Sequence, residues 1–284
     1  MPLSKVNIKN TQHEIDGGTP VLHVNDPHAL IMAAGYLKYN LAKKNQEGIY
    51  FRGQRKIYAS LPPTAYRSAK TNKAQAAKNA AIAEIISEYK KTGKIFNTFG
   101  DYAHEPLLQH YGIETTWVDV VDNLWVALWF ACYKSFSTGE SGKFLHFERR
   151  LTSDPDKYAY ILLIGADIGQ TVKGQPGYFH GPNTELVDLR IAAPSIFLRP
   201  HAQHGLLFRK KGNAAGARPA DYADQVRGVI RVDLTKALDW LGSGTIVNTH
   251  SIFPPPYYDN GYSILLTCGV PGNSVIGAIS HIGA

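Results

Sequence analysis

The chain has 284 residues, of which 44% are hydrophobic and 11% aromatic, and its formal net charge is +7. This composition supports a large folded core and excludes a disordered or low-complexity protein. No run of eighteen apolar residues occurs and residues 1–10 lack an apolar signal core, so we expect a cytoplasmic protein without a membrane span. The positive charge favours an anionic partner such as nucleic acid or a phosphate-bearing cofactor, although it also fits ordinary solubility.

The first part of the chain alternates helices with short strands. Asp26 and Pro27 predict a helix start, because Asp is a favourable N-cap and Pro a favourable first helical residue, and apolar residues then recur at helical spacing. A strand over residues 49–54 follows, and then a lysine-rich helix over 69–92. We interpret these lysines as a solvated face, with a phosphate-contacting surface as the alternative. The pattern further predicts a helix at 104–111, a strand at 115–118 and a helix at 123–135.

Short β-patterned runs separated by turn residues dominate the second part of the chain. They predict strands at 143–148, 158–164, 195–199, 206–209, 229–233 and 262–267, with a short helix at 235–241. No repeat interrupts this order. We therefore predict a single domain over residues 1–284 of the α+β class, with N-terminal helices packed on a mostly antiparallel sheet.

Residues 107–131 place polar side chains inside an otherwise apolar run. A buried polar group must find a partner or cost about 1–3 kcal/mol, so the cluster indicates a site rather than a plain core segment. It lies close to the start of the expected helix at 123–135, where free backbone N–H groups attract anions. The cluster consists of His110, Thr115, Thr116, Asp119, Asp122 and Asn123.

Three motifs of this chain, in order and in register, resemble the FRG-domain family, which is named for a (Phe/Tyr)-Arg-Gly sequence. They are Phe51-Arg-Gly-Gln54, the segment from Gln109-His-Tyr-Gly-Ile113 to Asp119 and Asn123, and Arg199-Pro-His-Ala-Gln203 with the residues that follow as far as Phe208. The resemblance covers about 48–210, which leaves 1–47 and 211–284 as accessory elements of one FRG-like domain. The chain has Glu114, Thr116, Val120 and Val121 where typical members have Pro, Arg, Trp and Thr, and the missing arginine implies an altered ligand preference.

The layout of the family in turn resembles the ADP-ribosyltransferase fold, which implies a split β-sheet and NAD as the substrate. By this resemblance, Arg52 grips the pyrophosphate or a ribose of NAD, because a guanidinium offers a bidentate fork to anionic oxygens. Asp119 takes the middle motif, and Gln203 takes a late-strand position where many transferases have Glu. An amide cannot act as a general base, so that duty falls to His110 or Asp119.

The resemblance thus implies a set of catalytic and NAD-binding residues, and each catalytic candidate has a structural alternative. The alternatives are a salt bridge for Arg52, a satisfied core histidine for His110, helix capping for Asp119 and sheet-edge hydrogen bonding for Gln203. The glycine after Arg52 permits close approach of a ligand. The NAD-binding set is Phe51, Arg52, Gly53, Gln54, Tyr111, Gly112, Thr115, Thr116, Asn123 and Arg199.

Metal ligation is not expected. His201 and His204 lie three residues apart, so on a strand they point to opposite faces, and a third ligand at suitable spacing is lacking. The two cysteines, Cys132 and Cys268, are too few for a thiolate zinc site or a disulfide framework, and we expect both to be buried, inert thiols.

Three functions follow as hypotheses. The first is NAD-dependent transfer of ADP-ribose to a macromolecular acceptor, with nucleic acid (DNA or RNA) expected from the basic charge, in a bacterial or phage toxin or defence factor. The second is a non-catalytic nucleotide- or nucleic-acid-binding module, which the amide at Gln203 favours. The third is a nuclease that uses His110 with Asp119 and needs no NAD.

Overall fold

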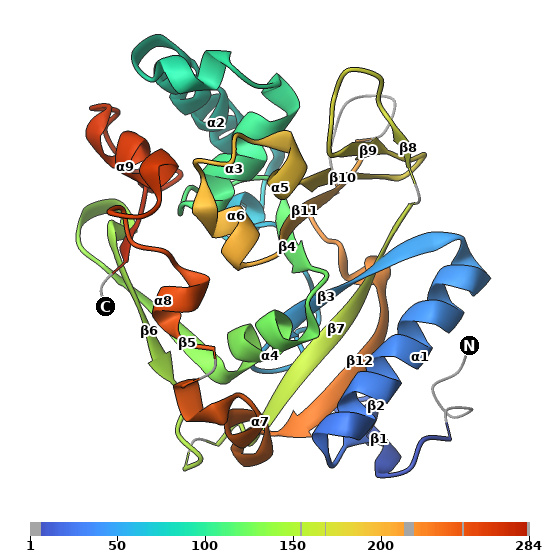
Figure 1. Cartoon of the computed structure of the whole chain (residues 1–284). Coiled ribbons are helices and arrows are strands. Elements are labelled where there is room, and N and C mark those ends of the chain that lie inside the picture. Colours follow the sequence, from blue (N-terminus) through green and yellow to red (C-terminus); the bar gives the residue numbers. More distant parts are fainter. Residues whose placement is uncertain (1–6, 154, 168, 213–218, 246, 283–284) are drawn as a thin grey trace.

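The structure is a computed structural model that describes residues 7–153, 155–167, 169–212, 219–245 and 247–282. Within this part of the chain, one large sheet has the strand order β1-β2-β12-β7-β3-β4-β11-β10-β9-β8 (Figure 1). Neighbouring strands are antiparallel except β2 and β12, which run parallel. The bounds are β1 Thr11–Asp16, β2 Thr19–Val24, β3 Glu47–Gln54, β4 Val118–Val121, β7 Tyr158–Asp167, β8 Gln170–Thr171, β9 Tyr178–His180, β10 Thr184–Asp188, β11 Gly205–Lys210 and β12 Val226–Asp233.

A second, smaller sheet lies beside the first. It has the order β13-β6-β5, with bounds β5 Tyr133–Thr138, β6 Phe144–Arg149 and β13 His281–Ile282. The strand β5 follows directly after a helix that packs on the large sheet, and this connection brings the small sheet close to the ends of β3 and β4. In this sheet β5 is an edge strand that pairs with β6 alone.

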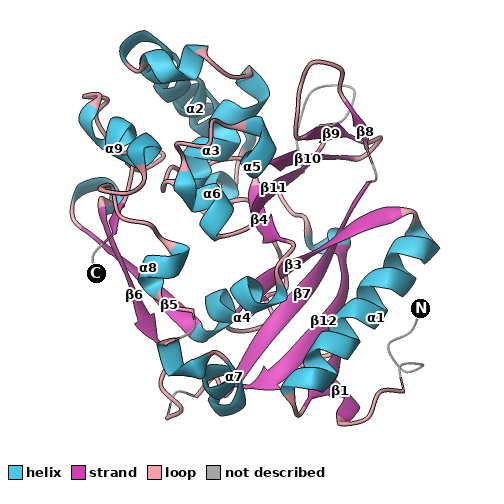
Figure 2. Ribbon diagram, viewed as in Figure 1, coloured by secondary structure: helices cyan, strands magenta, loops and turns pink. Residues whose placement is uncertain are grey.

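Two groups of helices cover one face of the large sheet (Figure 2). The first group packs on β3, β7 and β12 and consists of α1 Pro27–Asn45, α4 Leu124–Cys132 and α7 Leu234–Trp240. The second packs around β10 and β11 and consists of α2 Asn72–Thr92, α3 His104–His110, α5 Leu189–Ala192, α6 Leu198–Ala202 and α9 Asn260–Thr267. The short helix α8, Thr249–Ile252, joins α7 to α9. A third apolar cluster, which includes Leu162, Leu206 and Tyr222, lies on the opposite face.

The large sheet divides between β3 and β4. Strand β3 pairs with β7 along its whole length, from Glu47 to Gln54, but it pairs with β4 only through Phe51 and Val121. The strand β4 continues instead along β11. Since the backbone groups beyond this single pair have no ladder partner across the gap, they are open to side chains or to water.

The first helix follows the sequence pattern closely. Its start is fixed by Asp26, whose Oδ1 accepts a hydrogen bond from the Ala29 N–H at 2.8 Å, with Pro27 as the first helical residue. The helix ends where Gln46 takes a left-handed conformation with φ 55°. Its buried residues, which include Leu30, Ala34 and Leu37, have the predicted helical spacing.

Several expected boundaries and two expected strands are wrong. The run 262–267 is the helix α9, since Asp259 caps it by accepting a hydrogen bond from the Tyr262 N–H at 2.9 Å. The run 195–199 is a turn followed by α6, and Pro200 in that helix has no N–H for a ladder. Strand β4 begins at Val118, and α4 ends at Cys132, where β5 takes over.

The class is mixed α and β with a large, mostly antiparallel sheet, as predicted. The helices and strands, however, are not divided between the first and second parts of the chain as the sequence suggested. Strands from the first part of the chain occupy central positions in the sheet, and the later helices α5, α6 and α9 are three of the five helices in the second group. A hairpin of β1 and β2, which was not predicted from the sequence, precedes α1. None of the described helices has the length and apolar character that crossing a membrane requires.

Candidate functional site

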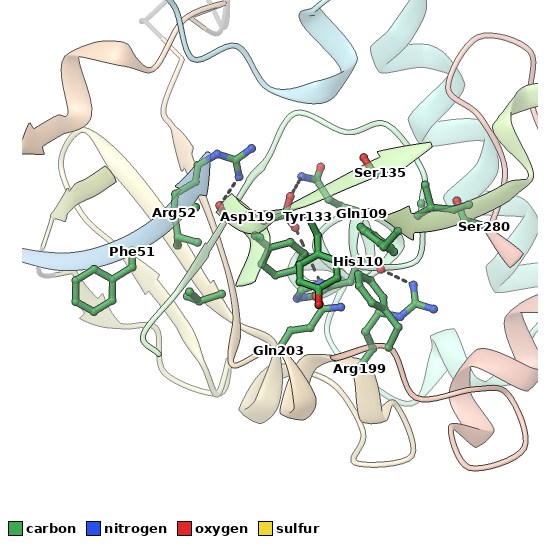
Figure 3. Close-up of a pocket in the computed structure, with 18 residues that line it drawn as sticks. Phe51, Arg52, Gln109, His110, Asp119, Tyr133, Ser135, Arg199, Gln203 and Ser280 are labelled. Atoms are coloured by element: carbon green, nitrogen blue, oxygen red, sulfur yellow. Dashed lines mark hydrogen bonds and ion pairs between the residues drawn. The ribbon is translucent and has the colours of Figure 1, made fainter. Parts of the chain in front are cut away.

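A pocket of about 270 Å³, here called the inner pocket, opens where β3 and β4 separate (Figure 3). Strands from both sheets and the C-terminal ends of α3 and α6 form its walls. Its polar lining residues are Arg52, Gln109, His110, Asp119, Ser135, Arg199, Gln203 and Ser280, and its large apolar ones are Phe51, Phe130, Tyr133, Leu145, Phe147 and Phe253. Polar groups that can bind charge therefore lie beside an aromatic wall that can exclude water.

Arg52 reaches across the gap in the sheet. Its Nη1 donates a hydrogen bond to the backbone carbonyl oxygen of Asp119 at 2.6 Å, and its Nε is buried with no hydrogen-bond partner among the described residues. Burial lowers the pKa of the guanidinium, the Asp119 carboxylate raises it, and the nearby Arg67 lowers it further. A carbonyl oxygen is neutral, so this contact orients Arg52 without cancelling its positive charge, which can still attract an anion.

A relay of hydrogen bonds holds the Asp119 carboxylate. Gln109 Nε2 donates to Asp119 Oδ2 at 2.7 Å, while Gln109 Oε1 accepts from the hydroxyl groups of Thr115 and Thr64. Because two hydroxyls donate to the amide oxygen, the amide nitrogen must face Asp119. Gln109 is thus a site residue that sequence reasoning missed, although it opens the Gln109-His-Tyr-Gly-Ile113 motif.

His110 ends α3 with its imidazole in the wall of the inner pocket. The ring is close to Asp119, with Nδ1 4.0 Å from Oδ1, and His110 is 8% exposed. Its Nε2 is buried and has no hydrogen-bond partner in the described part of the chain. Burial lowers the pKa of His110 to about 4, with Asp119 opposing this shift and Arg199 adding to it. The imidazole is therefore neutral at neutral pH and able to accept a proton.

The packing around His110 depends on Gly205, the first residue of β11. A Cβ atom at this position would lie 1.9 Å from His110 Nε2, closer than any real contact. Only glycine lets the imidazole lie against the backbone of β11. The position of the ring is thus fixed by the sheet as well as by α3.

Gln203 is not on a late strand, as was expected, but caps the C-terminal end of α6, two residues before β11. The late-strand position had been implied by the resemblance to the ADP-ribosyltransferase fold. Gln203 Nε2 donates to the carbonyl oxygen of Ile252 at 3.1 Å, and the side chain is buried in the wall of the inner pocket. Gln203 therefore lies near His110 but on a different element from the one predicted.

Arg199 supports the site from behind. Its Nη1 donates to the carbonyl oxygen of His110 at 2.7 Å, and its guanidinium stacks on the rings of Tyr111 at 4.2 Å and Tyr262 at 4.5 Å. Asp259 accepts hydrogen bonds from the Tyr111 hydroxyl at 2.7 Å and from the Arg199 N–H at 3.1 Å. This cluster fixes the end of α3, and it directs the Tyr111 hydroxyl away from the inner pocket.

Two predicted binding glycines have packing roles. A Cβ atom at Gly53 would lie 1.8 Å from the carbonyl oxygen of Ala127, so this glycine lets α4 pack on β3. Gly53 also lines the inner pocket, so its expected role in letting a ligand approach stays a prediction beside this packing role. Gly112 has φ +115°, and a Cβ there would meet the Ser280 hydroxyl oxygen at 2.1 Å, so it too is required by packing.

Thr116 and Asn123 do not line the inner pocket. The Thr116 hydroxyl donates to Glu105 at 2.7 Å, and Asn123 Oδ1 caps α4 by accepting from the Trp125 N–H at 2.9 Å. Thr115 is buried and acts through Gln109. Asp122, at the start of α4, pairs with Arg190 at 2.8 Å.

A second depression, here called the outer groove, shares Arg52, Gly53, Phe130, Tyr133 and Ser135 with the inner pocket and has a volume of about 520 Å³. Its further lining residues are Gln54, Arg55, Tyr58, Ser60, Leu61, Pro62, Arg67 and Lys134. Gln54, predicted to bind the cofactor, thus lies here. Four of the lining residues are cationic, and the described lining contains no carboxylate.

The two histidines considered for a metal lie on different structures from the strand expected. His201 lies in α6, and His204 follows it with φ 52° and its Nδ1 3.1 Å from Asp122 Oδ1. Among the residues that the structure describes, no group of three or more His, Cys, Asp or Glu could hold a metal ion. Cys132 and Cys268 are both free, and Cys268 is only partly buried.

Comparison with known families identifies the segment that supplies the catalytic candidates. Residues 47–139 match the family model of the FRG domain. This segment is an FRG domain. It contains Arg52, Gln109, His110 and Asp119, whereas Arg199 and Gln203, which were expected within the family resemblance, lie beyond the match. Searches of curated proteins and of solved structures found no match.

The FRG domain does not enclose the inner pocket alone. Leu145, Phe147, Arg199, Gln203, Phe253 and Ser280 complete its walls from later parts of the chain. The segment 211–284, expected to be accessory, therefore contributes directly to the site.

Proposed function

We propose that this protein transfers ADP-ribose from NAD to a nucleic-acid acceptor. The observation that carries the proposal is the arrangement of Arg52, Asp119 and His110 around the inner pocket. Arg52 keeps its charge and stands in the wall shared with the cationic outer groove, where it suits a pyrophosphate. His110 Nδ1 lies 4.0 Å from Asp119 Oδ1 in the same pocket. Asp119 can stabilise positive charge, and His110 can accept a proton.

The reaction breaks the bond between the nicotinamide nitrogen and C1′ of its ribose. The bonding electrons leave with nicotinamide, and the developing positive charge on the ribose is stabilised by the Asp119 carboxylate. A nucleophilic atom of the acceptor then bonds to C1′, and its proton passes to the imidazole of His110, which lines the inner pocket. Gln109 keeps Asp119 in place, and the aromatic wall of the inner pocket limits competing attack by water.

A second function, a nucleotide-binding module without turnover, is favoured by two observations. The Gln203 amide is engaged with a backbone carbonyl and cannot act as a base, and His110 has a pKa of about 4, which makes it a weak base. In this case the pocket binds the same ligand, but the acceptor remains unmodified.

Purified protein incubated with adenine-labelled NAD and separate pools of DNA, RNA and protein distinguishes these functions. Label transferred to a nucleic-acid pool, lost in Arg52→Lys and His110→Gln and kept in the exposed α2 variant Lys73→Gln, supports the transferase. Saturable NAD binding with neither transfer nor release of nicotinamide supports the binding module. Degradation of a pool without NAD would overturn both.

A further inference from the structure

The outer groove continues past Arg52 along the segment that follows β3. It shares Gln54, Tyr58, Ser60 and Leu61 with a further depression on the other side of Tyr58. The inner pocket, the outer groove and this extension thus follow one another, with the candidate catalytic residues at one end. The lining of the extension includes the carboxylates Asp16 and Asp156, so the part of this path that suits an anionic ligand is the outer groove.

Cations from three parts of the chain face the outer groove. Arg55 follows β3, Arg67 follows the 3-10 turn Thr64–Tyr66, and Lys134 lies on the edge strand β5. No carboxylate is found among the described lining residues of this groove. Cations on both sides of a groove match a ligand with a repeating negative charge, such as a phosphodiester backbone.

Tyr58 presents an aromatic ring within this path. The residue is 44% exposed, and its hydroxyl oxygen accepts a hydrogen bond from Arg55 Nε at 3.2 Å. Lys56 Nζ lies 5.3 Å from the ring centroid. An exposed ring flanked by cations offers a stacking surface for a base next to groups that bind the adjoining phosphates.

Only an unpaired base can use such a surface, because in a duplex the base faces are covered by their neighbours. A base must also leave its stack to enter the inner pocket of about 270 Å³. We infer that the outer groove binds a single strand of nucleic acid, with Tyr58 stacked on a base and Arg55, Arg67 and Lys134 at the backbone phosphates. This inference rests on the proposed function in that it names the acceptor, but binding along the groove requires no NAD.

The test is binding of fluorescently labelled single-stranded DNA, single-stranded RNA and duplex DNA of one mixed sequence, measured by anisotropy without NAD. We expect Tyr58→Ala to weaken single-strand binding about tenfold and Tyr58→Phe to leave it nearly unchanged, because the ring supplies the stacking. We expect Arg67→Gln and Lys134→Gln each to weaken binding and to reduce its salt dependence by about one phosphate contact. Lys73→Gln, an exposed charge-matched control on α2, keeps wild-type affinity.

Tighter binding of one single strand than of the other identifies DNA or RNA as the acceptor type, and in either case supports the inference. Equal or tighter binding of the duplex, or equal losses in Lys73→Gln and Lys134→Gln, would overturn it. Release of nicotinamide from NAD in the presence of the preferred single strand separates the two proposals. Its absence in the wild type contradicts the transferase and leaves the binding result standing, whereas release together with unchanged strand binding by Tyr58→Ala contradicts the groove assignment and leaves the transferase standing.

Discussion

The Arg52 guanidinium occupies the place of a missing ladder bond at Asp119. Strands β3 and β4 are joined only through Phe51 and Val121, and Arg52 Nη1 donates to the Asp119 carbonyl oxygen beyond that pair. The same residue pair thus closes the gap in the sheet and places a cation beside a carboxylate. The hydrogen bond from Arg52 to Asp119 therefore matters both for the sheet and for the proposed reaction.

Replacement of Arg52 by Lys is expected to weaken NAD binding by roughly ten- to a hundredfold. An ammonium group cannot contact the carbonyl oxygen and a pyrophosphate with the fork geometry of a guanidinium, and a charge-assisted hydrogen bond contributes about 1.5–3 kcal/mol. Isothermal titration with NAD measures the change. Lys73→Gln serves as the control, and unaltered affinity in Arg52→Lys would remove Arg52 from the binding site.

His110 is expected to make the folded state sensitive to acid. Its pKa is about 4 in the folded protein against an ordinary value of 6.5 for histidine, so the unfolded chain binds the proton more tightly. The free energy of unfolding therefore falls as the pH drops from about 6.5 to about 4, by about 3 kcal/mol from this group. His110→Gln should lose that part of the pH dependence in urea titrations.

Any pH dependence that remains in His110→Gln should come partly from His104 and His23, whose pKa values are also lowered by burial. If the free energy of unfolding from urea titrations depends on pH equally in the wild type and in His110→Gln, His110 is not held neutral.

Gly53→Ala is expected to destabilise the protein by about 1–3 kcal/mol, because the added methyl group would overlap the Ala127 carbonyl and push α4 from β3. Gly35→Ala is the matched control. No atom lies within 4 Å of a Cβ at Gly35 on α1, and alanine is favoured over glycine in a helix by about 1 kcal/mol. Thermal unfolding should move in opposite directions in the two variants. A stable Gly53→Ala that has lost only NAD binding would support the ligand-approach explanation.

Gln109→Leu is expected to lower kcat about tenfold with little change in KM. Leucine removes the hydrogen bond that orients the Asp119 carboxylate, but it leaves Arg52 in place. Thr115→Val, which removes one of the hydroxyl donors to Gln109, should have a smaller effect of the same kind. Steady-state kinetics of nicotinamide release provide the measurement, and an increase in KM alone would assign Gln109 to binding instead.

Caps in the sequence predicted one helix correctly and went unused at another. Asp26 with Pro27 placed α1 correctly, whereas the cap at Asp259 was overlooked and the apolar run after it was interpreted as a strand. A short apolar run fits a buried helix as well as a strand, and only its caps distinguish the two. The run 195–199 offered no such signal, because α6 begins without a side-chain cap.

Part of the candidate site was predictable as residues, but its geometry was not. The motifs pointed to Arg52, His110 and Asp119, which do line one pocket. Sequence patterns gave no signal that Gln109 orients Asp119, since an amide in a helix is usually a surface residue. They also gave no means to separate a glycine required by a ligand from one required by a helix, as at Gly53.

Asp259, Tyr111 and Tyr262 surround Arg199, and two of these residues come from the C-terminal part of the chain. The C-terminal part therefore helps to fix the position of α3. Arg199 donates a hydrogen bond to the carbonyl oxygen of His110, the last residue of α3. Loss of order in the C-terminal segment would therefore shift the His110 imidazole, although that segment's part of the cluster acts only through Arg199 and Tyr111. A fragment limited to residues 47–139 would keep Arg52, His110 and Asp119 but lack Arg199 and Asp259, which fix the end of α3. Recombinant work on this protein therefore calls for the long chain.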